Sequence, residues 1–266
     1  MSIVEVRHLV KRYNGTTAVN DLSFAVEPGE LFGFLGPNGA GKTTTINILC
    51  TLLAPTSGTA QVAGFDCGTQ SRDVRRQIGI IFQDPSLDDR LTAWENLLFH
   101  AMIYHVPARE RRGRMESVLE MVDLADRRHT VVKQFSGGMK RRLEIARGLL
   151  HRPKVLFLDE PTIGLDPQTR RRMWEFIEIL RDEHQMTLFL TTHYMEEAEA
   201  CDRAAIIDHG RLVALDTPEA LKTRYASSDA SLEDVFIQLT GYEIRDGEAA
   251  DRDLLRRVRR WSKNLR

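Results

Sequence analysis

The sequence is poor in cysteine and contains no long hydrophobic run. Its three cysteines, Cys50, Cys67 and Cys201, stand far apart, so their spacing matches neither a disulfide framework nor a zinc site and is typical of a reducing cytosol. No run of about 18 apolar residues occurs, so we expect a chain that does not span a membrane. The first residues, MSIVEVRHL, lack a basic segment followed by an apolar one, which predicts no secretory signal.

The sequence also lacks an excess of charge of either sign. Lys+Arg number 37 and Asp+Glu number 38, and the net charge of −1 disfavours a globally basic nucleic-acid binder. Hydrophobic residues make up 42% and charged residues 28%, which is ordinary for a globular protein and excludes disorder as the dominant state. The 266 residues suffice for one large α/β domain, alone or with a modest appendage.

Short, almost wholly apolar segments indicate buried strands. They lie at residues 31–35, 78–82, 155–158 and 186–190. Runs of this length suit strands that are covered on both faces of a mostly parallel sheet. We expect a helix from residue 42 to about 53, and the N-terminal segments 3–8 and 16–26 have weaker strand patterns. Strands separated by helices predict an α/β core.

Residues 91–150 have almost no strand pattern and are expected to form an inserted helical subdomain of about 60 residues, too small to be independent. Thr92 followed by Glu95 is typical of a capping box that opens a helix. Further helices follow, and the last is expected to run from Gly137 to about Leu150. The middle of the chain therefore differs in structure from the strand-rich N-terminal third.

The C-terminal end changes character again after a small, polar linker at residues 226–231. Apolar residues recur at helical spacing between 232 and 239. We therefore expect one large domain over residues 1–225 and an extension of short helices with a basic tail over 226–266. Residues 251–266 carry seven basic side chains against two acidic ones. This tail fits either a helix on an anionic membrane surface or a helix docked on the protein itself.

A glycine-rich segment follows the apolar run at 31–35 and precedes the first expected helix. Its sequence, GPNGAGKT, fits the phosphate-binding pattern G-x-x-x-x-G-K-[ST]. Glycines let successive backbone N–H groups point at phosphate oxygens, Lys42 reaches the β- and γ-phosphates, and the Thr43 hydroxyl suits Mg²⁺. A turn without a ligand is the disfavoured alternative, because strand and helix flank the motif as expected. The expected nucleotide-binding residues here are Gly36, Asn38, Gly39, Ala40, Gly41, Lys42, Thr43 and Thr44.

Two carboxylates end the apolar run at 155–158. Asp159 is expected to hold Mg²⁺, directly or through water, and Glu160 to orient and deprotonate an attacking water. Two solvated acids at a strand end are the plainer interpretation of this pair alone. The phosphate-binding segment with Lys42 makes the catalytic interpretation the better one.

Further motifs then align with one family. Gln83 follows the strand at 78–82, FSGGMKRRLEIARGLL contains Ser136, LDEPTIGLDP contains Asp166, and His193 ends the last apolar strand. Together they resemble the nucleotide-binding subunit of an ATP-binding cassette (ABC) transporter over nearly all of residues 3–220. The resemblance implies an α/β fold: a P-loop NTPase core with a mostly parallel sheet, an N-terminal antiparallel β subdomain and the inserted α-helical subdomain.

The resemblance also implies a role for each matching residue. Tyr13 would stack on adenine, and Gln83 would contact Mg²⁺ and the attacking water and sense the membrane partner. His193 would hydrogen-bond the γ-phosphate. Asp166 would couple two sites across a dimer, although an Asp before Pro is also a good helix N-cap. The residues that would contact the γ-phosphate bound to the opposite subunit are Ser136, Gly137 and Gly138.

One position departs from the family pattern. Met139 stands where the family usually has Gln, and Met cannot make the polar contact of an amide, so we expect a weaker contact there and no loss of function. The variant FSGGMKRR is similar to that of drug- and polysaccharide-export members. Residues 231–241 resemble the short extension of ATPases that serve exporters of the daunorubicin type.

The resemblance implies an ATPase that dimerises around two ATP molecules with Mg²⁺ and drives export of a small hydrophobic or drug-like compound. Its expected partners are a separate transmembrane permease subunit and a second ATPase subunit, with no nucleic acid, at the cytoplasmic face of the cell membrane. Export of a polysaccharide or lipid, or a soluble ABC ATPase without transport, are the alternatives. The chain lacks the paired cassettes of translation-type members and the long coiled coil of repair-type members, which favours transport.

Overall fold

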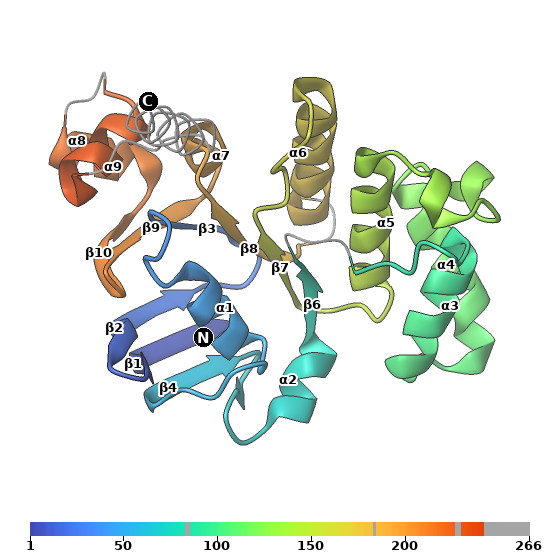
Figure 1. Ribbon diagram of the computed structural model, residues 1–266, viewed down its shortest axis with the longest axis horizontal. Helices are drawn as coiled ribbons and strands as arrows, with labels where there is room; N and C mark the ends of the chain where they lie inside the picture. The colour runs from blue at the N-terminus through green and yellow to red at the C-terminus, as the bar shows by residue number, and fades with distance from the viewer. Residues whose placement is uncertain (83–85, 183–184, 227–229, 242–266) are drawn as a thin grey trace, which may run out of the picture.

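The computed structural model describes residues 1–82, 86–182, 185–226 and 230–241. Within these ranges the chain forms a four-stranded sheet of order β2-β1-β4-β5 and a six-stranded sheet of order β10-β9-β3-β8-β7-β6. Figure 1 shows both sheets on one side of the molecule and the helices α3, α4 and α5 on the other. The basic tail expected at 251–266 lies outside the described residues.

The N-terminal sheet is antiparallel, as the family resemblance implied. Val4 pairs with Val26 on one side and with Val62 on the other, and Val4 and Val6 are buried where the alternating pattern predicted a strand. The strands are β1 (Val4–Tyr13), β2 (Thr16–Val26), β4 (Ser57–Val62) and β5 (Phe65–Asp66).

The larger sheet is mostly parallel. Strands β9, β3, β8, β7 and β6 pair in parallel, and β10 is antiparallel to β9 at the edge. Every residue of β3, β7 and β8 is buried, as expected for short apolar runs covered on both faces. The strands are β3 (Leu31–Leu35), β6 (Ile78–Ile81), β7 (Val155–Asp159), β8 (Thr187–Thr192), β9 (Arg203–Asp208) and β10 (Arg211–Asp216).

An aromatic cluster joins the two sheets. Phe24 of β2 lies 5.6 Å from Phe32 and 5.4 Å from Phe34, both on β3, measured between ring centroids. Phe189 of β8 lies 5.3 Å from Phe157 of β7 and 6.0 Å from Phe24. These contacts hold β3 against the antiparallel sheet and so fix the position of Leu35, the residue from which the next loop starts.

The first helix, α1 (Lys42–Leu49), ends before the predicted limit near residue 53. Thr51, with φ of +61°, adopts a left-handed conformation just after the helix, which breaks the helical repeat. The other helices outside the inserted region are α2 (Ser71–Gln77), α6 (Pro167–Asp182), α7 (Met195–Glu199), α8 (Pro218–Tyr225) and α9 (Leu232–Thr240).

Between β6 and β7 the chain is helical, in agreement with the sequence pattern. Thr92 and Glu95 form the expected capping box at the start of α3, because the Thr92 side chain accepts from the Glu95 N–H and Glu95 binds back to the Thr92 N–H. The elements are α3 (Ala93–Ile103), α4 (Ala108–Met121), the short 3₁₀ helices Ala125–Arg127 and Val132–Gln134, and α5 (Gly137–Leu149).

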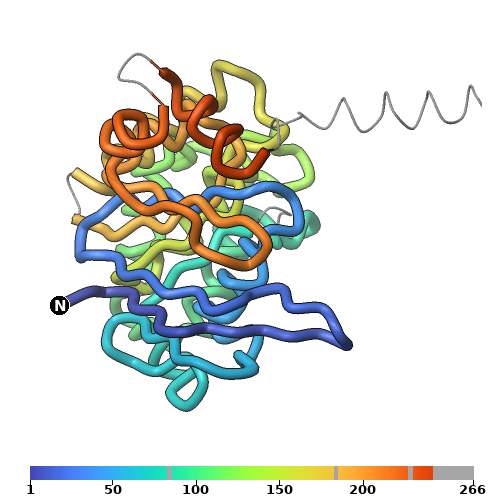
Figure 2. Tube along the Cα trace, turned by 90° about the vertical axis from the view of Figure 1, so that its left-hand side faces the viewer, coloured from blue at the N-terminus to red at the C-terminus, as the bar shows by residue number. Residues whose placement is uncertain are grey.

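The C-terminal helices pack beside the larger sheet. Leu232, Val235 and Phe236 of α9 are buried in a cluster with Leu35 of β3 and Ile206 of β9. Figure 2 shows the blue N-terminal strands below this orange and red C-terminal part. Among the described helices, none combines the length and the apolar character needed to cross a bilayer. The three cysteines are free and buried, which agrees with the expected absence of disulfides.

Candidate functional site

The ends of three neighbouring parallel strands bring the predicted site residues to one edge of the larger sheet. Leu35 of β3 pairs with Thr192 of β8, and Thr191 pairs with Asp159 of β7. The segment 36–43, His193 and Glu160 follow these strand ends directly. Because loops at the carboxyl ends of parallel strands bind ligands in open α/β sheets, this edge is the candidate site.

The loop after β3 has a shape that only glycine permits at two positions. A Cβ at Gly36 would lie 2.5 Å from the Ile207 carbonyl oxygen. Gly41 has φ of +104°, and a Cβ there would lie 2.4 Å from the Ala18 carbonyl oxygen. The loop therefore packs tightly on its inner side, while Asn38, Gly39 and Thr43 are exposed on the outer side.

Lys42 folds back over its own loop. Its Nζ donates to the carbonyl oxygens of Gly36 at 2.6 Å and Pro37 at 3.2 Å. Burial lowers the pKa of Lys42, and the negative charges of Glu160 and Asp159 act in the opposite direction. The ammonium group thus binds carbonyl oxygens of its own loop and is influenced by the charges of both carboxylates.

Asp159 is buried at the end of β7. One carboxylate oxygen accepts a hydrogen bond from Thr191 Oγ1 at 2.6 Å. Burial raises the pKa of Asp159, and the bond from Thr191 partly opposes this shift. A buried carboxylate in this state gains from any cation placed beside it.

Glu160 and His193 form a close pair. His193 Nδ1 lies 3.5 Å from Glu160 Oε1, and this contact is the main cause that lowers the pKa of Glu160, while burial raises it. Glu160 has φ of +47°, and its N–H is bound to the carbonyl and hydroxyl oxygens of Thr191, both at 3.1 Å. Glu160 thus has a left-handed backbone conformation, which is uncommon for a residue other than glycine.

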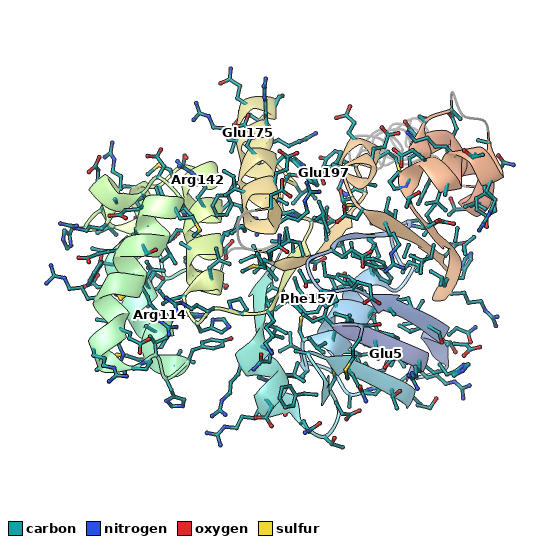
Figure 3. The ribbon with its side chains drawn as sticks, turned by 180° about the vertical axis from the view of Figure 1, so that it is seen from behind. Glu5, Arg114, Arg142, Phe157, Glu175 and Glu197 are labelled. Atoms are coloured by element: carbon teal, nitrogen blue, oxygen red, sulfur yellow. The ribbon has the colours of Figure 1, made fainter. Side chains whose placement is uncertain are left out.

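The glycine-rich start of α5 lies away from the phosphate-binding loop of the same chain (Figure 1). Ser136 caps this helix by accepting from the Met139 N–H at 3.3 Å, and Ser136 and Gly137 are exposed. A Cβ at Gly138 would lie 2.5 Å from Thr169 Cγ2, so this glycine allows α5 to approach α6 closely. Figures 1 and 3 show α5 and α1 apart, with strands of the larger sheet between them.

Met139 and Asp166 have contacts that explain their residue types. The Met139 side chain packs against a hydrophobic cluster that the helical segment shares with the larger sheet, and the weaker polar contact expected there stays a prediction. Asp166 accepts from the N–H groups of Gln168 at 3.1 Å and Thr169 at 3.0 Å, so it forms the N-cap interactions of α6 that the Asp-Pro pattern offered. Its coupling role stays a prediction.

Two predicted residues have little structural context. Tyr13 ends β1 with 43% of its surface exposed, and Lys11 Nζ lies 5.2 Å from the centre of its ring. An exposed ring at this place is free to stack on a base. Gln83 lies outside the described residues, so its predicted contacts with Mg²⁺ and water stay predictions.

The sequence patterns missed Arg141. This buried side chain of α5 donates to the carbonyl oxygen of Pro161 at 2.9 Å and pairs with Glu144 Oε2 at 3.2 Å. It also donates to the carbonyl oxygens of Phe82, Asp159 and Glu160. Arg141 thus ties α5 to the ends of β6 and β7. Within FSGGMKRRLEIARGLL it is one basic residue among several, and only the fold distinguishes it.

Comparisons with known proteins identify the family of this chain. The sequence matches the ABC transporter family over residues 19–163. The daunorubicin/doxorubicin resistance ATP-binding protein of Streptomyces peucetius is 44% identical over 85% of this chain and 68% of that protein. The linearmycin resistance ATP-binding protein of Bacillus subtilis is 41% identical over 90% of this chain and 75% of that protein. A dimeric ATP-binding cassette, solved after hydrolysis with ADP and Pi, is 27% identical with a TM-score of 0.73, over 80% of this chain and 98% of that one.

The parallel sheet, the loop from Gly36 to Thr43 and the acidic end of β7 define a P-loop nucleoside triphosphatase. Within that class, the chain belongs to the ABC transporter family. It is an ATP-binding subunit that hydrolyses ATP. The resemblance stated from the motifs alone is therefore confirmed, as is the fold class.

Proposed function

We propose that this ATPase powers the export of a small hydrophobic or drug-like compound through a separate membrane subunit. Both relatives described above are named for resistance to antibiotics, and they align with most of this chain. The similarity to these relatives is the observation that carries the export proposal. The position of Lys42, Asp159, Glu160 and His193 at one sheet edge supports the ATP hydrolysis that would power it. Polysaccharide or lipid export, and an ABC ATPase without transport, have less support from these relatives.

The edge of the sheet fits a nucleotide with Mg²⁺. Thr43 offers an exposed hydroxyl, and Asp159 offers a buried carboxylate without a salt-bridge partner among the described ion pairs. No cluster of three His, Cys, Asp or Glu suited to a metal occurs in the described part of the chain. Mg²⁺ with few protein ligands and several phosphate oxygens requires only such a pair. Bound Mg²⁺ would neutralise charge on the phosphates during hydrolysis.

The chain's own groups supply the chemistry. Lys42 binds the phosphate oxygens in exchange for its carbonyl contacts with Gly36 and Pro37. The contact with His193 lowers the pKa of Glu160 and so favours its carboxylate form, which would orient the attacking water and accept its proton. His193 donates a hydrogen bond to the γ-phosphate.

The site is completed by a second copy. Ser136 and Gly137 are exposed at the start of α5, which lies apart from α1 in the same chain. We propose that these groups contact the γ-phosphate held by the partner copy, so that ATP bridges two subunits and its hydrolysis releases them. Thr169 donates to Asp166 and also lies next to Gly138 at the start of α5. Asp166 would therefore lie at the contact between the two subunits.

A mixing experiment tests the shared site. Ser136→Arg protein and Lys42→Ala protein, each of low activity alone, are combined and ATPase activity is measured. Mixed dimers hold one site damaged twice and one intact site, so activity above that of either variant supports the proposal. A mixture of two copies of the Lys42→Ala protein with different tags serves as the control for mixing itself. Activity recovered in that control to the same level would contradict shared sites.

The face of α3 offers a surface for the membrane subunit. Phe99, Met102 and Ile103 are 63%, 52% and 54% exposed and lie on one side of the helix at i, i+3 and i+4. Exposed apolar residues gathered this way are typical of a protein interface. We propose that a cytoplasmic helix of the permease packs here and holds the subunit at the cytoplasmic face of the membrane.

This surface is testable against a matched control. Phe99→Asp should reduce recovery of one multi-span membrane protein from solubilised membranes while the ATPase activity of the isolated subunit is unchanged. Ile179→Asp, at an exposed apolar residue of α6, should leave recovery unchanged. Recovery of ribosomes or DNA in place of a membrane protein would contradict the transport proposal.

A further inference from the structure

A buried carboxylate outside the predicted site joins the two segments that carry Glu160 and His193. Glu197 lies on the short helix α7 and is 3% exposed. Figure 3 shows it at the junction between α6 and the segment that follows β8. A buried carboxylate is costly unless donors surround it, so its partners indicate what it stabilises.

Three side chains donate to Glu197. Thr162 Oγ1 and Trp174 Nε1 bind Oε1, the indole at 3.1 Å, and Thr192 Oγ1 binds Oε2. The indole N–H can only donate, and both threonine hydroxyls donate in these bonds, so all three groups point their hydrogens at Glu197. The donors come from the turn after β7, from α6 and from the end of β8.

The Thr192 bond controls the backbone around His193. Thr192 stands immediately before His193, and its hydroxyl also accepts from the Tyr194 N–H at 2.9 Å. The Thr192 hydroxyl therefore connects the residue before His193 to the residue after it, and the bond to Glu197 fixes the position of that hydroxyl.

The bond from Thr162 to Glu197 holds the turn that follows Glu160. Thr162 is 1% exposed and belongs to the turn in which the Ile163 N–H binds the Glu160 carbonyl oxygen at 3.3 Å. Glu197 thus adds a side-chain connection between the turn after Glu160 and the turn at His193, beyond the backbone pairing of β7 with β8.

We propose that Glu197 is a positioning residue that keeps Glu160 and His193 in the relative placement that hydrolysis requires. The inference rests on the proposed roles of Glu160 and His193. It predicts an effect on turnover without an effect on ATP binding, because Glu197 lies behind the site and the Lys42 loop has separate contacts. Misplacement of catalytic groups by about 1 Å can cost about a hundredfold in rate.

The test removes one hydrogen bond at a time. Thr192→Val, which suits a strand, removes the connection to the His193 turn, and Trp174→Phe removes a bond to the same carboxylate without touching either turn. Each protein is measured for thermal unfolding, for ATP affinity and for the kcat and KM of Mg-ATP hydrolysis. We expect Thr192→Val and Glu197→Gln to lower kcat about tenfold to a hundredfold with unchanged ATP affinity, and Trp174→Phe to keep the wild-type kcat.

A double variant separates positioning from general damage. In single-turnover hydrolysis of labelled ATP, Thr192→Val should lower the rate much less in a His193→Ala background than in wild type. An equal factor in both backgrounds, a wild-type kcat in folded Thr192→Val, or an equal loss in Trp174→Phe would overturn the inference. Glu160→Gln is run alongside: undiminished hydrolysis there would refute the proposed catalysis itself, whatever the Glu197 result.

Discussion

Arg141 offers a direct test of how the helical segment is tied to the site. Arg141 is 6% exposed, its guanidinium binds carbonyl oxygens at the ends of β6 and β7, and Glu144 beside it is fully buried. Arg141→Met keeps a long apolar stem and removes the charge. It leaves the Glu144 carboxylate with the Ser86 N–H at 2.7 Å and with Arg147 at 3.8 Å.

The magnitude follows from these contacts. Removing one partner of a buried ion pair typically costs about 3–5 kcal/mol. Because Glu144 keeps two other partners, we expect Arg141→Met to lower the free energy of unfolding by about 3 kcal/mol, near the low end of that range. Arg142→Met is the matched control, since Arg142 pairs with Asp123, whose side chain is 99% exposed. Its expected cost is about 1 kcal/mol or less.

Urea unfolding followed by circular dichroism measures both variants without nucleotide. Adding Glu144→Gln to Arg141→Met should recover about 1 kcal/mol, because it removes the carboxylate that lost its partner. Equal stability of the Arg141→Met and Arg142→Met proteins, or a further loss in the double variant, would refute the reasoning.

Three other changes have defined outcomes. Lys42→Ala should weaken ATP affinity and turnover together, and wild-type values in a binding titration and an ATPase assay would contradict the phosphate-site assignment. His193→Ala removes the main cause that lowers the pKa of Glu160, so that pKa should rise and the acid limb of the kcat profile should move to higher pH; an unmoved limb in pH-dependent kinetics would count against the pair. Gly138→Ala should lower the melting temperature because its Cβ meets Thr169 Cγ2, and Thr169→Ser should restore part of the loss; no recovery in a thermal scan would contradict that contact.

Local sequence was sufficient for the elements that the structure confirms. The loop at Gly36–Thr43 and the pair Asp159–Glu160 are contiguous motifs that follow or end the strands β3 and β7, and their chemical roles stay predictions. The buried strands β3, β7 and β8 are short apolar runs because both of their faces are covered. Burial on two sides leaves a pattern that sequence alone reveals.

Interactions between distant segments escaped prediction. Arg141 binds Phe82 and Glu197 binds Thr162 across 59 and 35 positions of the chain, and no spacing rule connects such residues. Strands β4, β5, β9 and β10 were not predicted. Strands β5 and β10 lie at sheet edges, and β4 has three exposed residues, so their patterns are weak. Strand β9 is a buried interior strand whose apolar run is only four residues long. The end of α1 was predicted too late, since the left-handed Thr51 has no sequence signature.

The central claim is that ATP joins two copies of this chain until Glu160 allows hydrolysis. The most direct measurement is the mass of Glu160→Gln protein by light scattering at saturating Mg-ATP, with hydrolysis recorded in parallel. The account predicts a stable ATP-bound dimer and nearly abolished turnover, because ATP still binds while the γ-phosphate bridge persists. A monomer at saturating Mg-ATP together with undiminished hydrolysis would contradict it.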